Sequence, residues 1–267
     1  MRVISVNTNG IRAAGRKGFF QWLSRQRADF CCVQETKAQI HQLDEPLYHP
    51  RNHHVYYRDA QKKGYSGVAI YSRHEPRAVV KSLVEASGGN PDWQEFDDEG
   101  RYLELQFGNL SIISLYLPSG SSKEERQQAK MRFLDLFLPY LKSLHEHDRE
   151  YVLCGDWNIA HTTADIRNWK ANQKNSGFLP EERAWMDQLF GEAKFVDGFR
   201  QLPQKDHEYT WWSNRGRAWD NNVGWRIDYH VTTPGIGSTV TGSRIYRKKR
   251  FSDHAPLILD YDFELKV

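Results

Sequence analysis

The chain of 267 residues is 39% hydrophobic and 13% aromatic, which is enough apolar material for a substantial core. Its 37 basic and 34 acidic side chains give a formal net charge of only +3, which excludes a simple polycation but allows separate basic and acidic regions. No apolar run approaches the roughly 20 residues that a membrane-spanning helix needs, so no membrane partner is expected.

Strand-like runs recur along the whole chain, with alternating or continuous apolar residues. In chain order they are Val3–Asn7, Asp29–Glu35, Val55–Arg58, Gly67–Arg73, Ala78–Val84, Tyr102–Phe107, Leu110–Leu117, Tyr151–Gly155, Tyr209–Trp212, Trp225–Thr232, Ser238–Ile245 and Ala255–Tyr261. The pair Gly108-Asn109 stands between two of these runs and predicts a tight β-hairpin.

Helical patterns are fewer. One helix is expected near Phe19–Leu23, and a second should end at Gly191 after starting at Pro180, because proline suits the first turn of a helix. Between them lies a longer helix, which Pro139 is expected to kink. Its apolar face consists of Phe133, Leu134, Phe137, Leu138, Leu141 and Leu144.

The order of these elements predicts an α/β fold. Many strands with helices between them favour a four-layer αββα sandwich of two packed mixed β-sheets flanked by helices. Since no repeat, low-complexity tract or convincing linker interrupts the chain, one domain over residues 1–267 is expected. Cys31 and Cys32 are adjacent in one strand and should point to opposite faces of its sheet. No secretion signal precedes the first strand and no disulfide spacing is present, so a reducing, cytoplasmic location is expected.

Several of the apolar strands end abruptly in a short polar motif. These motifs are Asn7-Thr8-Asn9-Gly10, Gln34-Glu35-Thr36-Lys37, Tyr116-Leu117-Pro118, Gly155-Asp156-Trp157-Asn158, Trp225-Arg226-Ile227-Asp228 and Ser252-Asp253-His254. A single carboxylate after a strand is usually a turn or cap residue. Strand ends of layered sheets can converge on one edge, however, and the set then combines carboxylates, amides, a phenol and a carboxylate–imidazole pair.

Such a set of hard oxygen ligands suits Mg²⁺ or Mn²⁺, which bind few protein carboxylates and leave positions for water or phosphate. Phosphodiester hydrolysis needs these components: a metal at the phosphate oxygens, a group that activates water, and donors to the developing charge. The motifs therefore favour a metal-dependent phosphodiesterase.

The six motifs, in this order, resemble the exonuclease III family of abasic-site endonucleases within the endonuclease/exonuclease/phosphatase superfamily. The resemblance runs from Asn7 to His254, nearly the whole chain. It implies a Mg²⁺-dependent DNA repair nuclease, with Mn²⁺ as a substitute. Such an enzyme hydrolyses the phosphodiester 5′ to abasic sites and removes nucleotides or blocking groups from DNA 3′ ends. The implied protein is a nucleoid-associated monomer, and its partner is double-stranded DNA with abasic sites, nicks or blocked 3′ ends.

The resemblance also implies roles for individual residues. Glu35 is the principal metal ligand with Asn7 and Asn9 nearby, and Asp253 is a second candidate ligand. Asp156 orients or deprotonates the attacking water.

Four further residues take part in the implied chemistry. Asn158 assists at the attacking water, and Tyr116 donates to the scissile phosphate. His254 contacts a phosphate oxygen and is held by Asp228, because a carboxylate fixes the tautomer and favours the charged imidazole.

Three groups of residues are expected to bind DNA. Within the segment 165–178, Asn172 and Asn175 are expected near the target phosphate, and Gly177 leaves space for an abasic or flipped sugar. The residues expected to wall the sugar pocket are Trp211, Trp225 and Ile227. The densest basic run includes Arg247, Lys248 and Lys249, and phosphate contacts of this kind supply most of non-specific DNA affinity.

Two alternatives share part of this pattern. A non-catalytic nucleic-acid-binding regulator of the same family has lost catalytic residues, whereas this chain keeps Asp156, Asp228 and His254. A superfamily phosphatase acting on a lipid or a small phosphoester shares the Asp-x-Asn and Ser-Asp-His motifs. The DNA-contacting segment and the basic run argue against it.

Overall fold

The computed structural model describes residues 1–121 and 123–267. Within these residues the strands form two six-stranded sheets and one two-stranded ribbon. The first sheet contains, side by side, β13 (Val240–Ile245), β14 (Leu257–Tyr261), β1 (Arg2–Asn7), β2 (Phe30–Gln34), β4 (Val68–Ser72) and β3 (His54–Arg58). The second contains β5 (Ala78–Val80), β6 (Tyr102–Gln106), β7 (Leu110–Tyr116), β8 (Glu150–Asp156), β12 (Asp228–Thr232) and β9 (Val196–Asp197). The ribbon pairs β10 (Trp211–Trp212) with β11 (Gly224–Trp225).

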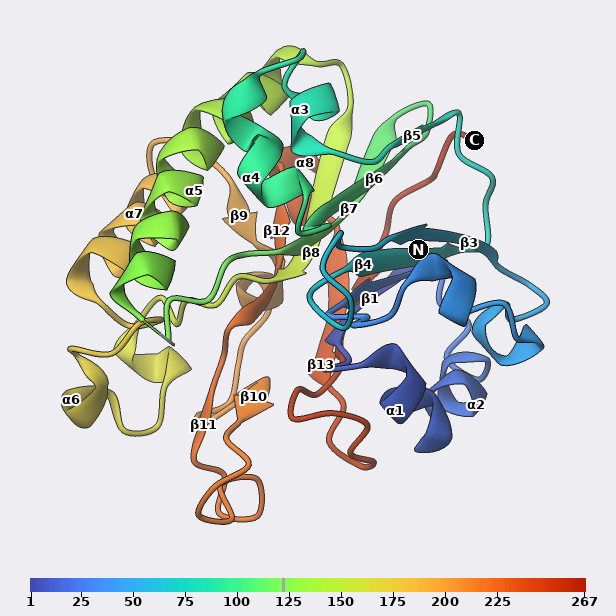
Figure 1. The fold of residues 1–267 in the computed structure, drawn as a ribbon. Coiled ribbons are helices and arrows are strands. Elements are labelled where there is room, and N and C mark those ends of the chain that lie inside the picture. Colours follow the sequence, from blue (N-terminus) through green and yellow to red (C-terminus); the bar gives the residue numbers. More distant parts are fainter. Residues whose placement is uncertain (122) are drawn as a thin grey trace.

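Helices cover the outer face of each sheet, as Figure 1 shows. The α-helices are α1 (Ile11–Arg16), α2 (Phe19–Leu23), α3 (Leu83–Ala86), α4 (Gln94–Asp97), α5 (Glu124–Ser143), α6 (Trp169–Asn172), α7 (Pro180–Phe190) and α8 (Pro234–Gly237). Short 3₁₀ helices lie at Ile40–Gln42, Pro46–Tyr48, Pro91–Trp93, Leu144–Glu146, Thr163–Asp165 and Gly198–Gln201. None of the helices in the described part of the chain has both the length and the hydrophobicity that crossing a bilayer requires.

Alternation along the strands produces this layering. On β8, Val152 and Cys154 point into the core between the two sheets, while Tyr151 and Leu153 point to the helical layer that contains α5 and α7. On β2, Cys32 faces the core between the sheets and Cys31 faces α1 and α2, as predicted from their adjacency. The four-layer αββα prediction is therefore confirmed.

Most predicted elements appear close to their expected bounds. The Gly108-Asn109 hairpin joins β6 to β7, where the N–H of Phe107 donates to the carbonyl of Leu110 over 2.8 Å. Helix α7 begins at Pro180 and ends before Gly191, and α5 continues through Pro139.

Two predicted strands are wrong in part, because groups distant in the chain accept their backbone N–H groups. The run Ala78–Val84 is a strand only to Val80, since the Asp97 carboxylate accepts the N–H groups of Leu83 and Val84 and starts α3. The run Trp225–Thr232 is broken between β11 and β12, where the backbone N–H groups donate elsewhere. That of Arg226 donates to the carbonyl of Asp165, and that of Ile227 donates to the Thr210 hydroxyl.

Candidate active site

Strand register brings the polar motifs to one edge of the sandwich. In the second sheet, β7 and β8 are parallel and pair Tyr116 with Asp156. Strand β12 runs antiparallel to β8 and starts with Asp228 opposite Asp156. In the first sheet, the parallel strands β1 and β2 pair Asn7 with Gln34, the residue before Glu35.

These side chains continue the inner faces of the sheets. Asp156 lies two residues beyond Cys154, so it points into the space between the sheets, as Cys154 does. A layer of polar residues separates the apolar core from this edge. There the side-chain amide of Gln34 donates to Ser114 Oγ over 3.1 Å, and Ser114 Oγ donates to the carbonyl of Val33 over 3.1 Å. The site is therefore the polar end of the inter-sheet core.

Asn7 links two carboxylates that belong to different sheets. Its Nδ2 donates to Glu35 Oε1 over 2.7 Å and to Asp156 Oδ2 over 2.8 Å. Glu35 has a φ of 50°, in the left-handed region that few residues other than glycine adopt. That sharp turn at the end of β2 aims its carboxylate across the edge at Asp156.

His254 and Asp228 form a buried pair. His254 Nδ1 lies 2.9 Å from Asp228 Oδ2, and His254 Nε2 lies 3.8 Å from Asp156 Oδ2. Burial alone would lower the pKa of His254, but the carboxylates of Asp228 and Asp156 raise it to about 10. The imidazole is therefore held as a cation at neutral pH, with Nδ1–H donating to Asp228 and Nε2 left to face the cleft.

The surroundings of Asp156 disfavour a negative charge on its carboxyl group. Burial raises its pKa to about 7; the His254 cation opposes this, and the carboxylates of Asp228 and Glu35 add to it. A carboxylate poised near neutrality is suited to exchanging a proton with water. Asn158 follows at a φ of 52°, and its Nδ2 donates to the carbonyl of Leu117 over 2.9 Å.

Tyr116 remains a hydroxyl donor. Burial and the nearby Glu35 raise its pKa well above the usual value, while Arg101 opposes the shift. The Arg101 guanidinium stacks 4.8 Å from the centre of the Tyr116 ring and also donates to the Tyr116 carbonyl over 2.9 Å.

Three groups converge at this edge, where the carboxylate oxygens could hold a cation but the protonated His254 could not. One ligand atom from each of Glu35, Asp156 and His254 lies within 4.8 Å of the others. The Lys37 ammonium already bridges Glu35 Oε2 and Asn9 Oδ1, each over 2.6 Å. The Lys37 ammonium thus contacts oxygens of two predicted metal ligands, Glu35 and Asn9. The donor set fits a divalent cation that prefers oxygen ligands.

The further candidate ligands Asn9 and Asp253 contact each other. Asn9 Nδ2 donates to Asp253 Oδ1 over 2.9 Å, so both ends of the Asn9 amide are engaged. Asp253 also accepts from Ser252 Oγ and from the Trp211 indole. Burial opposes ionisation of Asp253, but His254 and hydrogen bonds from Asn9 and Ser252 lower its pKa. Metal ligation by Asn9 and Asp253 stays a prediction.

A cleft of about 670 Å³ opens over these groups. Its lining includes eleven of the predicted residues: Glu35, Tyr116, Asp156, Asn158, Asn175, Gly177, Trp211, Trp225, Ile227, Asp253 and His254. Asn7 and Asp228 lie buried directly behind it. Asn172 is not part of this lining, but it holds Asn175, whose Nδ2 donates to Asn172 Oδ1 over 2.7 Å.

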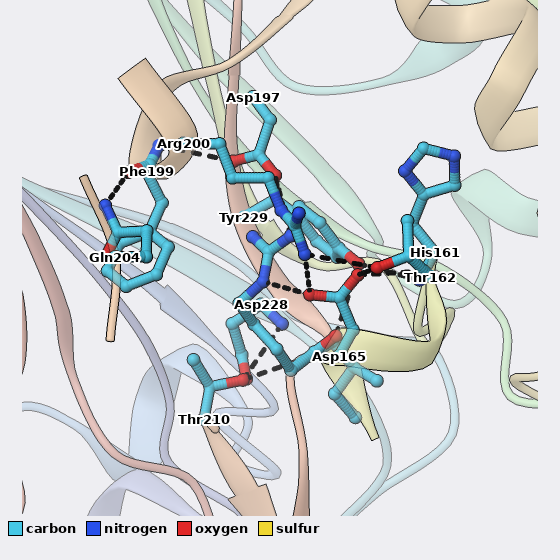
Figure 2. A network of polar contacts seen from close by, with 12 residues as sticks. His161, Thr162, Asp165, Asp197, Phe199, Arg200, Gln204, Thr210, Asp228 and Tyr229 are labelled. Atoms are coloured by element: carbon cyan, nitrogen blue, oxygen red, sulfur yellow. Dashed lines mark hydrogen bonds and ion pairs between the residues drawn. The ribbon is translucent and has the colours of Figure 1, made fainter. Parts of the chain in front are cut away.

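A buried ion cluster supports one wall of the cleft. Arg226, between Trp225 and Ile227, donates from Nε to Asp165 over 2.6 Å and from Nη2 to Asp197 over 2.7 Å. Figure 2 shows these two carboxylates with Arg200, beside the backbone of Asp228 and the Thr210 hydroxyl that accepts from it. Burial opposes ionisation of Asp165, yet Arg226 and Arg200 lower its pKa to about 2.

The basic run lies away from this lining. The Arg247 guanidinium packs 4.6 Å from the Trp212 ring centre and donates to the carbonyl of Trp219 over 3.0 Å. Lys248 and Lys249 are exposed, and the Lys249 ammonium lies 5.8 Å from the Phe251 ring centre. Their contact with DNA stays a prediction.

Sequence reasoning missed four residues of the cleft, namely Ser119, Gly120, Ser121 and Arg215, whereas the lining residues Lys174 and Ser176 fall within the segment 165–178 that was expected to contact DNA. Ser119–Ser121 directly follow the Tyr-x-Pro motif, so their position after a strand end was an available signal. Arg215 lies in the long loop between β10 and β11, whose path no periodicity specifies.

The fold and the site together define the class of protein. Residues 4–254 match the Endonuclease/Exonuclease/phosphatase family, and the chain belongs to that family. Among curated proteins, it is 39% identical over 261 residues to "Exodeoxyribonuclease" of Bacillus subtilis, covering 97% of this chain and 98% of that protein. It is 35% identical to "DNA repair nuclease APEX1" of Danio rerio, covering 97% and 81%. A solved AP endonuclease from Archaeoglobus fulgidus superposes with a TM-score of 0.86 at 26% identity, covering 98% and 100%. The resemblance to abasic-site endonucleases is confirmed.

Proposed function

We propose that this protein is a divalent-metal-dependent DNA repair nuclease. It hydrolyses the phosphodiester 5′ to abasic sites and removes nucleotides or blocking groups from DNA 3′ ends. The observation that carries the proposal is the convergence of Glu35, Asp156 and His254 within 4.8 Å beneath an open cleft. The two curated relatives described above carry the names of an exodeoxyribonuclease and a DNA repair nuclease.

Asp156 handles the attacking water. Its Oδ1 accepts the backbone N–H of Asn158 and its Oδ2 accepts from Asn7, so both oxygens are fixed in direction. A pKa of about 7 lets it orient the water and take its proton at neutral pH. The side chain of Asn158, anchored through Nδ2, offers its carbonyl oxygen as a second acceptor.

His254 and Tyr116 handle the phosphate. The cationic imidazole donates from Nε2, and the protonated phenol donates from its hydroxyl, to oxygens on which negative charge develops. Asp228 orients the imidazole and stabilises its positive charge through Nδ1 over 2.9 Å. Preorganised donors of this kind stabilise the transition state more than the bound substrate.

Glu35 would hold the cation, with Asn7 fixing its carboxylate and with Asn9 and Asp253 as further candidate ligands. Mg²⁺ is the proposed ion and Mn²⁺ a substitute, because the donors are oxygens. When bound, the ion supplies positive charge to a phosphate oxygen. Lys37 would have to release Glu35, or move with it, as the ion enters.

The substrate fits the cleft through its sugar and its backbone. Trp211, Trp225 and Ile227 provide an apolar wall, and Gly177, packed against Trp225, adds no side chain to the cleft. Lys174 and Arg215 add positive charge to the lining, which suits a phosphate backbone. Arg247, Lys248 and Lys249 are proposed to extend this contact along the duplex.

The test compares abasic, nicked and fully matched duplexes, each with Mg²⁺ and with EDTA, beside phosphoinositide vesicles and a His254→Ala control. Cleavage of abasic duplex that requires metal and falls at least ~10²-fold in the control is expected. Binding without cleavage would instead indicate a regulator of the same family. Phosphate release from the lipid alone would indicate a phosphatase. Raising salt from 50 to 200 mM should weaken DNA binding at least ~10-fold, since counterions are released.

A further inference from the structure

A charged pair is buried in the helical layer behind the active site. Lys130 of α5 and Glu182 of α7 are both 0% exposed, and Lys130 Nζ lies 2.6 Å from Glu182 Oε1. Lys130 lies three and seven residues before Phe133 and Phe137, so it shares the face that α5 buries. A hydrophobic residue would suit that position, because taking charges out of water is unfavourable.

Lys130 is bound to the loop that carries Asn158. Its ammonium donates to the carbonyl of Asn158 over 2.8 Å. Asn158 adopts a left-handed φ of 52° and lies two residues after Asp156. The ammonium therefore directly stabilises the backbone beside Asp156, the residue expected to activate water.

Glu182 is bound to the turn that carries Gly177. Its Oε2 accepts the backbone N–H of Gly177 over 2.6 Å and that of Leu179 over 3.1 Å. Its Oε1 also accepts from Gln127 Nε2 over 3.0 Å. The carboxylate thus fixes the turn that presents Asn175 and Gly177 to the cleft.

Gly177 has little freedom to shift. A Cβ at this residue would lie 3.0 Å from the carbonyl oxygen of Asn158 and 3.1 Å from Trp225 Cζ3. The N–H of Ala160 also donates to the Gly177 carbonyl over 2.7 Å. Gly177 therefore packs between the Asn158 carbonyl and the Trp225 ring, where there is no room for a side chain.

We propose that Lys130 and Glu182 are positioning residues, which together fix the separation between Asn158 and the wall formed by Asn175 and Gly177. Lys130 holds the Asn158 side, Glu182 holds the Gly177 side, and their ion pair locks the two together. The consequence for catalysis rests on the proposed function. The structural part of the proposal, that Glu182 orders residues 175–179, does not depend on the proposed function.

Substitutions can separate the contribution of Lys130 at Asn158 from that of Glu182 at Gly177. In Glu182→Gln, one amide oxygen replaces two carboxylate oxygens, so it cannot accept from both Lys130 and Gly177. In the double variant Lys130→Met/Glu182→Gln, side-chain volumes are nearly kept and the amide oxygen is free for Gly177. Its N–H₂ faces Gln127, whose side-chain amide must rotate to present its carbonyl oxygen; that oxygen has no partner among the described residues. Asn158 alone then loses its donor.

A matched control lies between the same helix and the chain just after α7. Lys142 Nζ lies 2.6 Å from Glu192 Oε1, but this pair is 41% and 66% exposed. Glu192→Gln removes an ion pair without touching the cleft, and an exposed pair contributes little.

The experiment measures amide hydrogen exchange at Gly177 and Leu179, with kcat and KM on abasic duplex; circular dichroism verifies folding. In the wild type both amides should be protected. In Glu182→Gln their exchange should rise about tenfold or more, and kcat should fall about tenfold to a hundredfold with a smaller change in KM. In the double variant protection should return while kcat stays low. Glu192→Gln should match the wild type.

Fast exchange of both amides in the wild type would overturn the proposal. This measurement does not require any variant to fold. Near-wild-type kcat in the folded double variant would show that Lys130 does not position Asn158 for catalysis. If the wild-type protein does not cleave abasic duplex, the proposed function fails while the exchange data still test the ordering of residues 175–179.

Discussion

The pair of Asp228 and His254 makes a quantitative prediction. Asp228→Asn removes the charge that most strongly raises the pKa of His254. The pKa of that imidazole should then fall from about 10 toward its ordinary value near 6.5, because burial still lowers it while Asp156 and Asp253 still raise it. The amide can also donate a hydrogen bond to Nδ1, which favours the neutral imidazole over the cation.

The expected loss of activity depends on pH. If catalysis needs the protonated imidazole, the wild type keeps nearly all of it at pH 8. A pKa of 6.5 leaves only about 3% of the variant protonated, a loss of about 30-fold. At pH 6 about three quarters of the variant is protonated, so most of the loss from deprotonation should disappear. A bound cation lowers the pKa in both proteins, so the ratio of variant to wild type at each pH is the informative quantity.

The assay is the rate of abasic-duplex cleavage from pH 5.5 to 9.5 at saturating Mg²⁺. Asp187→Asn is the matched control, since Asp187 forms an exposed pair with His161 over 2.7 Å outside the cleft lining; its profile should overlay the wild type. A deficit of equal size at pH 6 and pH 8 would refute the reasoning, because Asp228 would then act without controlling the protonation of His254.

Three further predictions follow from the same geometry. Asp156→Asn should reduce abasic-duplex cleavage at least ~10²-fold with an unchanged circular dichroism spectrum, because no other side chain takes the water's proton; a rate near wild type would exclude Asp156 as the base. Glu35→Gln should raise the Mg²⁺ concentration for half-maximal rate, and the Kd for Mn²⁺ by calorimetry, at least ~10-fold, and identical titrations would exclude it as a ligand. Burial lowers the pKa of His230 to about 3. Since this lies below the unfolded value, stability is fully present above about pH 6.5 and falls by about 2 kcal/mol from pH 7 to pH 5. Urea unfolding of His230→Asn should lack this loss, and equal pH dependence in both proteins would contradict it.

Much of the site could be predicted from sequence because the polar residues stand at strand ends. Asn7, Glu35 and Asp156 each follow an apolar strand, and the parallel pairing of β1 with β2 and of β7 with β8 brings such ends to a common edge. Asp228 reaches the same edge from an antiparallel strand. The alternation of apolar residues likewise predicted the layering of the sheets.

The remainder depended on contacts between residues distant in the chain. Leu83 begins a helix because Asp97 accepts its backbone N–H, and the one local signal for it, the N-cap Ser82, stands inside the strand-like run Ala78–Val84. Arg247 packs on Trp212 instead of lining the cleft, a choice set by tertiary packing. Lys130 was detectable as a lone charge on an apolar helical face, but its partner Glu182 lies 52 residues away.

The inward direction of Asn7 and Asp156 has a consequence for how the gene can change. Both side chains reach the site only because each lies an even number of residues from a core position on its own strand, such as Val3 and Cys154. Deleting one codon within β1 or β8 would turn the reactive group toward the helices while the strand still formed. Insertions in the outer loops do not reverse the direction of any strand side chain. Differences in length between related sequences should therefore occur in those loops and be absent from β1 and β8.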